Sequence, residues 1–382
     1  MIPYGRQDIS QDDINEVIQV LRSDFLTQGP VVPKLENKLN EITGSKYSTA
    51  VNSATSALHL ACLALQVRAS DVVWTVPNTF VASANCALYC GAKIDFVDID
   101  PTTSNMSIES LTNKLKVAKK SGELPKVVIP VHLTGEPCDM ASIKALSYAF
   151  GFKIIEDASH AIGGRYGSRP IGACEYSDIT VFSFHPVKIV TSGEGGAALT
   201  NCPKIDQKLK LLRSHGITRD QNIMEFPSDN SWYYEQIDLG FNYRMTDIHA
   251  ALGLSQLSRL DKYVKKRHKI ANIYDHAFLN TKIMLPLRAA NNLSALHLYV
   301  IQVDERKHKD VFQSLRANNI GVNIHYIPVH THPYYQKLGF KWGDFPNSEA
   351  YYRKAISLPL FPRLELEHQN IVIDTVKSLC DK

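Results

Sequence analysis

Short apolar runs alternate with helical patterns between residues 47 and 200 of the chain. The runs are rich in β-branched residues and read YSTAVN, VVWTVP, KIDFVDI, KVVIPVHL, FKIIED, ITVFSF and GGAALT. Strands separated by helices in this way are typical of a mainly parallel sheet with helices on both faces. The pattern therefore predicts an α/β fold with a seven-stranded sheet.

An amphipathic helix is predicted near the start of the chain. Ser10 can cap it, and Asp12 and Asp13 suit its positive end. Its apolar positions form one stripe: Ile14, Val17, Ile18 and Leu21. A second amphipathic helix follows the segment LTQGPVVP.

Beyond the predicted sheet, residues 215–244 form a long connection that is rich in aromatic residues. A connection of this length inside a compact domain is usually functional or disordered, and the aromatic residues favour an ordered one. A long helix begins at Thr246, and the runs HLYVIQV and GVNIHYI indicate further strands. We expect a large domain over residues 1–255 and a smaller C-terminal α/β domain over residues 256–382.

Composition narrows the function classes. The chain has 382 residues, 44% hydrophobic content and a formal net charge of +4 without a basic block, so nucleic acid is not an expected partner. No apolar run is long enough for a membrane span. The seven cysteines contain no Cys-x-x-Cys pair, which favours reduced thiols in a cytoplasmic protein and argues against a metal site.

Polar residues follow the predicted strands at their carboxyl ends. They are Asn52-Ser53, Asn78-Thr79, His132, Asp157 and Ser183. Ligands of open α/β sheets bind beyond this edge. We therefore expect the functional site there.

Lys188 is the first candidate for chemistry at this edge. It lies in VFSFHPVKIVTSGEGGAALTN, between apolar residues and a run rich in Gly and Ser. A poorly hydrated lysine has a lowered pKa, and its neutral amine is a nucleophile toward carbonyl groups. The alternative is a lysine that extends from a strand end into water.

Three further features suit a cofactor. Ser53, Thr55 and Ser56 lie where a strand becomes a helix, which favours a bound phosphate, although an ordinary helix cap is the alternative. Asp157 could hold a heterocyclic nitrogen protonated, or it could cap the next helix. Phe80 could stack on a flat ring, or it could belong to the core.

An aldehyde-binding amine, an anion pocket, an acid beside a ring nitrogen and a stacking face together describe a site for pyridoxal 5′-phosphate (PLP). His160, three residues after Asp157, could contact the same ring or its phenolic oxygen; the alternative is a packed structural histidine. The predicted cofactor is therefore PLP.

The chain resembles the DegT-like sugar-nucleotide aminotransferases, which are PLP-dependent transferases of fold type I. The resemblance spans nearly the whole length and rests on the motifs FLTQGPVVPKLE, NSATSALHLA, VPNTFVASAN, VHLTGEPCDM, IIEDASHAIG, VFSFHPVKIVTSGEGGAALTN, GFNYRMTDIHAALGLSQL and NIHYIPVHTHPYY. It implies a large PLP-binding domain with a seven-stranded sheet and a smaller C-terminal domain.

The resemblance also implies roles for individual residues. Lys188 would form the Schiff base with PLP and shuttle the proton, and Asp157 would pair with the pyridinium nitrogen. The other implied cofactor contacts are His160 and Phe80 at the ring, Ala54, Thr55 and Ser183 at the phosphate, and Asn242 from the neighbouring subunit. Many relatives have glutamine at the position of His160. The shared site would require a homodimer.

The implied reaction is transamination of a nucleotide sugar with L-glutamate as amino donor. Within the family, the chain looks most like the transaminases of pseudaminic acid biosynthesis. Lys188 stands where the family's dehydratases have histidine, which favours transamination over dehydration. Our candidates for binding the sugar diphosphate are Arg219, His325 and Tyr326.

Three alternatives are weighed against this function. A transaminase could act on another 4-keto sugar, of the bacillosamine, perosamine or aminoarabinose type. A non-catalytic PLP-binding scaffold could keep the fold. A nicotinamide dehydrogenase would require a Gly-x-Gly-x-x-Gly motif after its first strand, which the sequence lacks.

Overall fold

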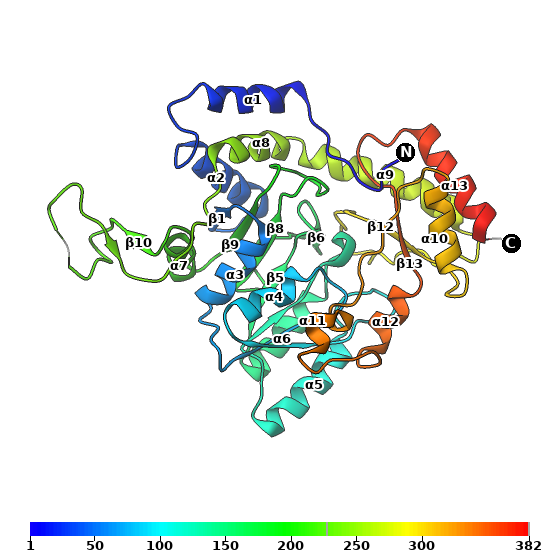
Figure 1. The fold of residues 1–382 in the computed structure, drawn as a ribbon, viewed down its shortest axis with the longest axis horizontal. Helices are drawn as coiled ribbons and strands as arrows, with labels where there is room; N and C mark the ends of the chain where they lie inside the picture. The colour runs from blue at the N-terminus through cyan, green and yellow to red at the C-terminus, as the bar shows by residue number, and fades with distance from the viewer. Residues whose placement is uncertain (227, 381–382) are drawn as a thin grey trace.

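A computed structural model describes residues 1–226 and 228–380. Its centre is a seven-stranded sheet with the order β1-β9-β8-β5-β4-β2-β3 (Figure 1). The strands are β1 (Tyr47–Val51), β2 (Val72–Thr75), β3 (Lys93–Phe96), β4 (Val127–Ile129), β5 (Lys153–Asp157), β8 (Ile179–Ser183) and β9 (Gly196–Thr200). Each lies in one of the predicted runs, so the predicted sheet is confirmed.

The sheet is mainly parallel, as predicted. Strands β3, β2, β4, β5 and β8 pair in parallel, whereas β9 runs antiparallel to both β8 and β1. Consecutive side chains point to opposite faces, so that Val181 and Phe182 belong to different core clusters. Both faces are thus buried, which explains why the strands read as nearly continuous apolar runs.

Helices cover both faces of the sheet. Side chains of α3 (Ala54–Ala64), α4 (Ala82–Tyr89) and α7 (Pro203–Arg213) share one core cluster. On the other face lie α2 (Val31–Thr43), α5 (Ile108–Ser121), α6 (Met140–Phe150) and α8 (Asp247–Leu257). The arrangement leaves the carboxyl ends of the parallel strands open at one edge.

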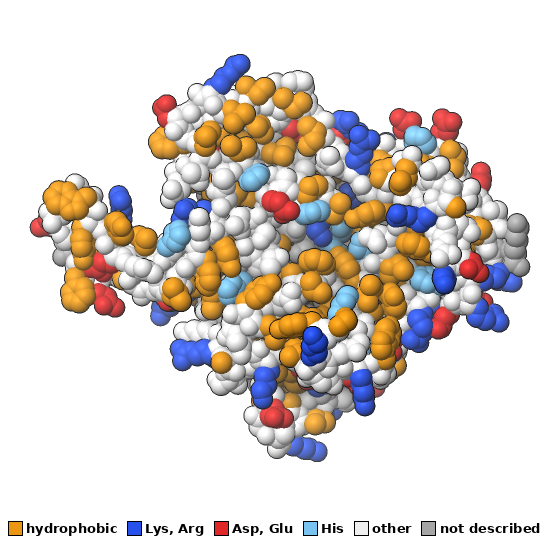
Figure 2. All heavy atoms as spheres, viewed as in Figure 1, with side chains coloured by type: hydrophobic (Ala, Val, Ile, Leu, Met, Phe, Trp, Pro, Cys, Tyr) orange, Lys and Arg blue, Asp and Glu red, His pale blue; other side chains and the backbone are white. Residues whose placement is uncertain are grey.

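The N-terminal helix α1 (Gln11–Leu21) forms as predicted, with reciprocal capping between Ser10 and Asp13. It packs along α8, but through its polar side, because Asp13 accepts hydrogen bonds from Ser255 and Gln256. The apolar stripe therefore faces outward, with Ile14, Ile18 and Leu21 exposed. Hydrophobic side chains gather on the surface over this helix (Figure 2).

The C-terminal part has a core cluster of its own. It is built from α9 (Leu260–Phe278), β12 (Tyr299–Gln302), α10 (His308–Ala317), β13 (Ala355–Leu358) and α13 (Leu366–Cys380). The N-terminal segment joins this part, since Ile2 pairs with residues 319–321 and the Tyr4 carbonyl accepts from the Leu360 N–H.

The remaining elements are short. They are β6 (Arg165–Tyr166), β7 (Arg169–Pro170), β10 (Ile217–Thr218), β11 (Glu235–Gln236), α11 (Pro333–Gln336), α12 (Pro346–Tyr352) and two 3-10 turns, Leu133–Gly135 and Val329–Thr331. The long connection predicted after residue 215 contains the β10–β11 hairpin, which projects away from the rest of the molecule (Figure 1). No helix in the described residues is long and apolar enough to cross a membrane.

Candidate active site

A cavity of about 570 Å³ lies at the carboxyl edge of the sheet. Nine of the residues predicted for the site line it: Ala54, Thr55, Phe80, Asp157, His160, Ser183, Lys188, His325 and Tyr326. They come together because parallel strands end at one edge and the segment after residue 322 lies against that edge. The volume is that of a small-molecule site.

Lys188 lies in the turn between β8 and β9. The turn is held by a hydrogen bond of 2.9 Å from the Lys188 N–H to the His185 carbonyl. Burial lowers the pKa of the Lys188 ammonium to about 8, and the negative charge of Asp157 partly opposes that shift. A substantial neutral fraction therefore exists near physiological pH, as a nucleophilic lysine requires.

Asp157 is the last residue of β5 and is 4% exposed. Its Oδ2 accepts a 2.6 Å hydrogen bond from the Ser83 hydroxyl, and its Oδ1 accepts from the Ser159 N–H at 3.1 Å. These donors fix the carboxylate in the cavity wall. It can face a cationic group there, which is the arrangement that a protonated ring nitrogen needs.

Three imidazoles lie around Lys188. The His160 and His297 rings are 4.3 Å apart, and His325 lines the same cavity. Burial, reinforced by the nearby Lys188 charge, lowers the pKa of His325 to about 3 and holds the pKa values of His160 and His297 well below their usual range. All three rings are therefore neutral at physiological pH and can exchange hydrogen bonds without adding positive charge.

The N-terminus of α3 forms part of the cavity wall. Ser53 caps the helix by accepting from the Ser56 N–H at 3.1 Å, and Ala54 and Thr55 face the cavity. The first residue of β9 comes so close that a Cβ on Gly196 would lie 2.5 Å from the Ala54 nitrogen. Helix N–H groups, the Thr55 hydroxyl and the nearby Ser183 make this end suitable for a phosphate.

Phe80 lies at the mouth of the cavity and is 57% exposed. The centre of its ring is 6.2 Å from that of Tyr326. The alternative of a core residue is therefore wrong. An exposed ring on a cavity wall is available to stack on a flat ligand.

Two predicted residues lie outside this cavity. Arg219 follows β10, and its guanidinium stacks on the Tyr234 ring at 5.8 Å within the hairpin region. The backbone of Asn242 pairs with Ser214 at the base of the same hairpin. Neither residue lines the cavity of its own chain.

Three residues among those that the sequence interpretation missed line the cavity and contact predicted site residues. Ser83 supports Asp157, His297 packs on His160, and Tyr4 packs on His325 with ring centres 5.5 Å apart. Ser83 lies inside the quoted motif VPNTFVASAN, three residues after Phe80, so its position on the first turn of a helix could have indicated it. Tyr4 and His297 lie far in sequence from the motifs at the sheet edge, so no motif indicates that they line the cavity.

The residues of the cavity fit PLP. An amine of lowered pKa, a buried carboxylate, a helix N-terminus and an exposed aromatic ring match its aldehyde, ring nitrogen, phosphate and ring face in chemistry. The Nδ1 atoms of His160 and His297 are buried and have no partner within the described residues, which suits a polar group on a ligand. Within those residues, no cluster of His, Cys, Asp or Glu could hold a metal ion.

Comparisons with known proteins show the family of the chain. The profile of the DegT/DnrJ/EryC1/StrS aminotransferase family matches residues 7–377. The chain is 38% identical to the spore coat polysaccharide biosynthesis protein SpsC of Bacillus subtilis, over 99% of this chain and 97% of that protein. It is 35% identical to the UDP-4-amino-4,6-dideoxy-N-acetyl-β-L-altrosamine transaminase of Campylobacter jejuni, over 100% and 98%.

Solved structures of sugar aminotransferases are similar to this chain over its whole length. The Helicobacter pylori PseC structure, an aminotransferase involved in pseudaminic acid biosynthesis, superimposes with a TM-score of 0.90 at 30% identity, covering 100% of this chain and 99% of that one. The sugar aminotransferase Spr1654 of Streptococcus pneumoniae, in its PMP form, gives 0.90 at 30% identity with the same coverage. A PLP form of Spr1654 is similar as well.

Fold and site together define a PLP-dependent sugar aminotransferase of fold type I. More particularly, the chain belongs to the DegT/DnrJ/EryC1/StrS aminotransferase family.

Proposed function

We propose that the protein transfers the amino group of L-glutamate to C-4 of a UDP-linked 4-keto-6-deoxy-N-acetyl hexose. The product would be UDP-4-amino-4,6-dideoxy-N-acetyl-β-L-altrosamine, an intermediate of pseudaminic acid biosynthesis. The observation that carries the proposal is the Lys188 amine of lowered pKa, which shares one cavity with Asp157 in a chain similar to the altrosamine transaminase over its full length.

The proposed roles follow from the geometry of the cavity. PLP supplies an aldehyde that accepts the amino group and a ring that takes up electrons. Lys188 would hold the cofactor and, once displaced, move a proton between substrate and cofactor carbons. Asp157 would stabilise the protonated ring nitrogen, Phe80 would cover the ring, and the start of α3 with Ser183 would bind the phosphate.

We propose that the sugar diphosphate binds near His325 and Tyr326, with Arg219 of a second copy. His325 and Tyr326 lie in the wall of the cavity, whereas Arg219 is carried on the projecting hairpin. A hairpin that extends away from its own chain can reach the site of a neighbour. The same geometry supports the proposed contact between Asn242 and the cofactor phosphate of the other subunit.

The proposed homodimer is also supported by the surface over α1. The helix leaves Ile14, Ile18 and Leu21 exposed, and Phe25 and Leu26 extend this apolar surface. Contiguous apolar surface of this kind marks a protein interface. An interface there would bury the stripe that gives the helix its amphipathic pattern.

The test of the reaction has two stages. Adding glutamate to the PLP-loaded protein should convert the cofactor to its pyridoxamine form, seen as a change in the visible spectrum; an unchanged spectrum would indicate a scaffold. Turnover is then measured with UDP-, GDP- and dTDP-4-keto sugars, with mass detection of the aminated product. Activity confined to GDP or dTDP sugars would overturn the proposed substrate.

A second candidate is a transaminase for a different nucleotide 4-keto sugar. The chain is also similar to SpsC, which is named for the biosynthesis of a different polysaccharide, that of the spore coat. This similarity supports the second candidate. The same panel of substrates distinguishes the two candidate functions, because they differ only in the nucleotide sugar that is aminated.

A further inference from the structure

Two hydroxyl groups lie in series behind the Asp157 carboxylate. The Ser83 hydroxyl donates to Oδ2 of Asp157 at 2.6 Å, and the Thr79 hydroxyl lies 2.8 Å from that of Ser83. A carboxylate can only accept, so the single hydroxyl proton of Ser83 goes to Asp157 and the Ser83 oxygen accepts from Thr79. The hydroxyl chain therefore runs from Thr79 through Ser83 to Asp157.

The hydroxyl chain is shielded from bulk water although it reaches the cavity. Thr79 is 2% exposed and Ser83 is 0% exposed, and both residues line the cavity. Because water does not compete for these groups, their hydrogen bonds hold the partners in fixed positions. A hydroxyl near the start of a helix commonly caps it, but α4 has no hydrogen bond to a capping side chain at Val81. The two hydroxyls serve the carboxylate instead.

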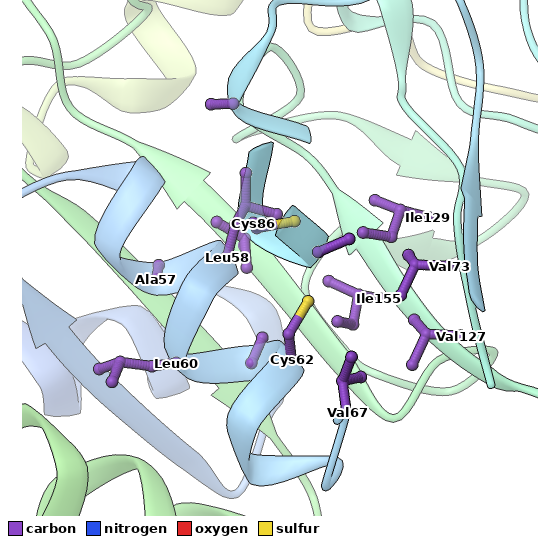
Figure 3. Close-up of a cluster of buried hydrophobic side chains, with 14 of the residues drawn as sticks. Ala57, Leu58, Leu60, Cys62, Val67, Val73, Cys86, Val127, Ile129 and Ile155 are labelled. Atoms are coloured by element: carbon purple, nitrogen blue, oxygen red, sulfur yellow. The ribbon is translucent and has the colours of Figure 1, made fainter. Parts of the chain in front are cut away.

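Helix α4 holds Ser83 in place because its buried side belongs to the core. Cys86 lies one turn after Ser83, and its thiol donates to the Ser83 carbonyl with the sulfur and oxygen 3.3 Å apart. Cys86 belongs to the same buried cluster as Ile155 of β5 (Figure 3). Side chains two residues apart on a strand point the same way, so Asp157 lies on the face of β5 that this cluster covers. The packing that fixes the helix thus also fixes the contact between Ser83 and Asp157.

The carboxylate is held at both of its oxygens. Oδ2 of Asp157 accepts from the Ser83 hydroxyl, and Oδ1 accepts from the Ser159 N–H at 3.1 Å. A carboxylate oxygen has two lone pairs, so each oxygen keeps one for a further donor. The two bound donors set the plane of the carboxylate and hence the direction of the remaining lone pairs. This direction matters for a ligand, because a hydrogen bond weakens steeply as its angle becomes less linear.

We propose that Thr79 and Ser83 are positioning residues for the cofactor, whose hydroxyl chain holds the Asp157 carboxylate in the orientation that accepts a hydrogen bond from the protonated ring nitrogen of PLP. The inference rests on the role proposed for Asp157 and is independent of the sugar that is aminated. Neither hydroxyl needs to touch the cofactor. Without the chain, the carboxylate can turn about its side-chain bonds and direct its lone pairs elsewhere.

Proton NMR of the protein loaded with ring-¹⁵N-labelled PLP tests the orientation directly. We expect the wild type to show a low-field proton that is coupled to the ring nitrogen. In Ser83→Ala this proton should move upfield by more than its linewidth, because its hydrogen bond to a turned carboxylate is weaker. An unchanged position of the signal in Ser83→Ala would overturn the proposal.

Asp157→Asn separates a failure of the hydroxyl chain from a failure of the role proposed for Asp157. This variant should lose the coupled signal, since a neutral amide does not favour a charged ring nitrogen. If Asp157→Asn kept the wild-type signal, the role of Asp157 and the hydroxyl chain would both be wrong. If Asp157→Asn lost the signal and Ser83→Ala kept it unchanged, only the hydroxyl chain would be wrong.

A double-variant cycle tests whether the two hydroxyls act in series. In titrations of the cofactor-free protein with PLP, we expect Thr79→Val to weaken binding by about threefold and Ser83→Ala by about tenfold. The double variant should also lose about tenfold, because Thr79 acts only through Ser83. A loss of about thirtyfold would mean that the two residues act independently, which contradicts the chain.

Two further variants show that the effect belongs to the chain and not to the loss of any buried hydroxyl. Thr79→Ser keeps the donor and should bind PLP within about twofold of the wild type. Ser147→Ala is the matched control, because the Ser147 hydroxyl is also buried on a helix, donates to the Phe152 carbonyl at 2.6 Å and lies outside the cavity. We expect this variant to lower thermal stability without changing the NMR signal. A similar upfield shift in Ser147→Ala would show that general loosening is the cause.

Discussion

The Tyr326 hydroxyl lies 3.0 Å from Nε2 of His160, although the two residues are 166 positions apart. Both residues line the cavity, and the bond joins the carboxyl edge of the sheet to the segment that precedes α11. Since the imidazole is neutral, a hydroxyl that donates to Nε2 places the ring proton on Nδ1, whereas a hydroxyl that accepts from Nε2–H leaves Nδ1 as an acceptor; Nδ1 has no partner within the described residues. The pair therefore sets which hydrogen bond His160 can offer to a ligand.

We expect Tyr326→Phe to weaken PLP binding by about 3- to 10-fold, the effect of losing one hydrogen bond worth about 0.5–1.5 kcal/mol. Titration of the cofactor-free protein with PLP, followed by absorbance, measures the effect. Tyr334→Phe is the control, because that ring is 59% exposed and does not line the cavity. Equal affinity of both variants would show that the Tyr326 hydroxyl has no such role.

Lys188→Ala should reduce transamination by at least about 1000-fold, since both the covalent attachment and the proton transfer depend on this amine. Product formation measures the loss, and borohydride reduction followed by peptide mapping measures the attachment. Lys153→Ala, at an exposed lysine that pairs with Asp178, should change neither. A pyridoxyl adduct on a different lysine in the wild-type protein would contradict the assignment.

The pH dependence of the amine follows from its lowered pKa. Below about pH 8 the Lys188 ammonium is charged, and above it the neutral amine accumulates, so reaction with an aldehyde should accelerate as pH rises and level off above 8. The rate is measured by adding salicylaldehyde, an aldehyde without a phosphate, to the cofactor-free protein. The rate for Lys188→Ala is subtracted, which leaves the reaction of Lys188 itself. Asp157→Asn removes the charge that favours the ammonium, so the midpoint should move to lower pH; movement to higher pH would refute this electrostatic account.

Gly196→Ala should lower the stability of the cofactor-free protein by about 1–3 kcal/mol, because the added Cβ would overlap the backbone of Ala54. Gly253→Ala in α8 is the matched control. A Cβ there meets only side-chain atoms, at 3.4 Å or more, and helix propensity favours the alanine by up to about 1 kcal/mol. Thermal unfolding compares the two, and a similar change in both would show that the contact between β9 and α3 tolerates the extra atom.

The double variant Ile18→Asp with Leu21→Asp should dissociate the proposed dimer, since it places two charges on the apolar surface over α1. Sedimentation velocity measures the mass. Val117→Asp, at a residue of α5 that is 68% exposed, is the control and should leave the mass unchanged. A wild-type protein that sediments as a monomer at micromolar concentration would remove the basis for both the dimer and the shared site.

The sequence predicted the sheet and its polar edge because strands buried on both faces require continuous apolar runs, and because the residues that end parallel strands share one edge. It also predicted α1 and its cap correctly. It did not predict which side of α1 is buried, since an apolar stripe can face either the core or another chain. Here Ser255 and Gln256 bind Asp13 and turn the polar side inward.

The candidate site was predictable where a residue ends a strand or lies in the turn after it, as with Asp157 at the end of β5 and Lys188 in the turn after β8. Tyr4 and His297 lie outside those positions. Tyr4 lies near the start of the chain and His297 just before β12, and they pack on His325 and His160 in the cavity. Periodicity describes one element at a time, so contacts of this kind have no local signal.

The pairing of Ile2 with residues 319–321 has a consequence for biosynthesis on the ribosome. The Tyr4 carbonyl receives its partner only when Leu360 has been made, long after the sheet strands have been synthesised. The wall of the cavity that contains Tyr4 and His325 is therefore completed late in translation. Lys188 has been synthesised long before that point, so the lysine of the site exists well before this wall of the cavity can close around it.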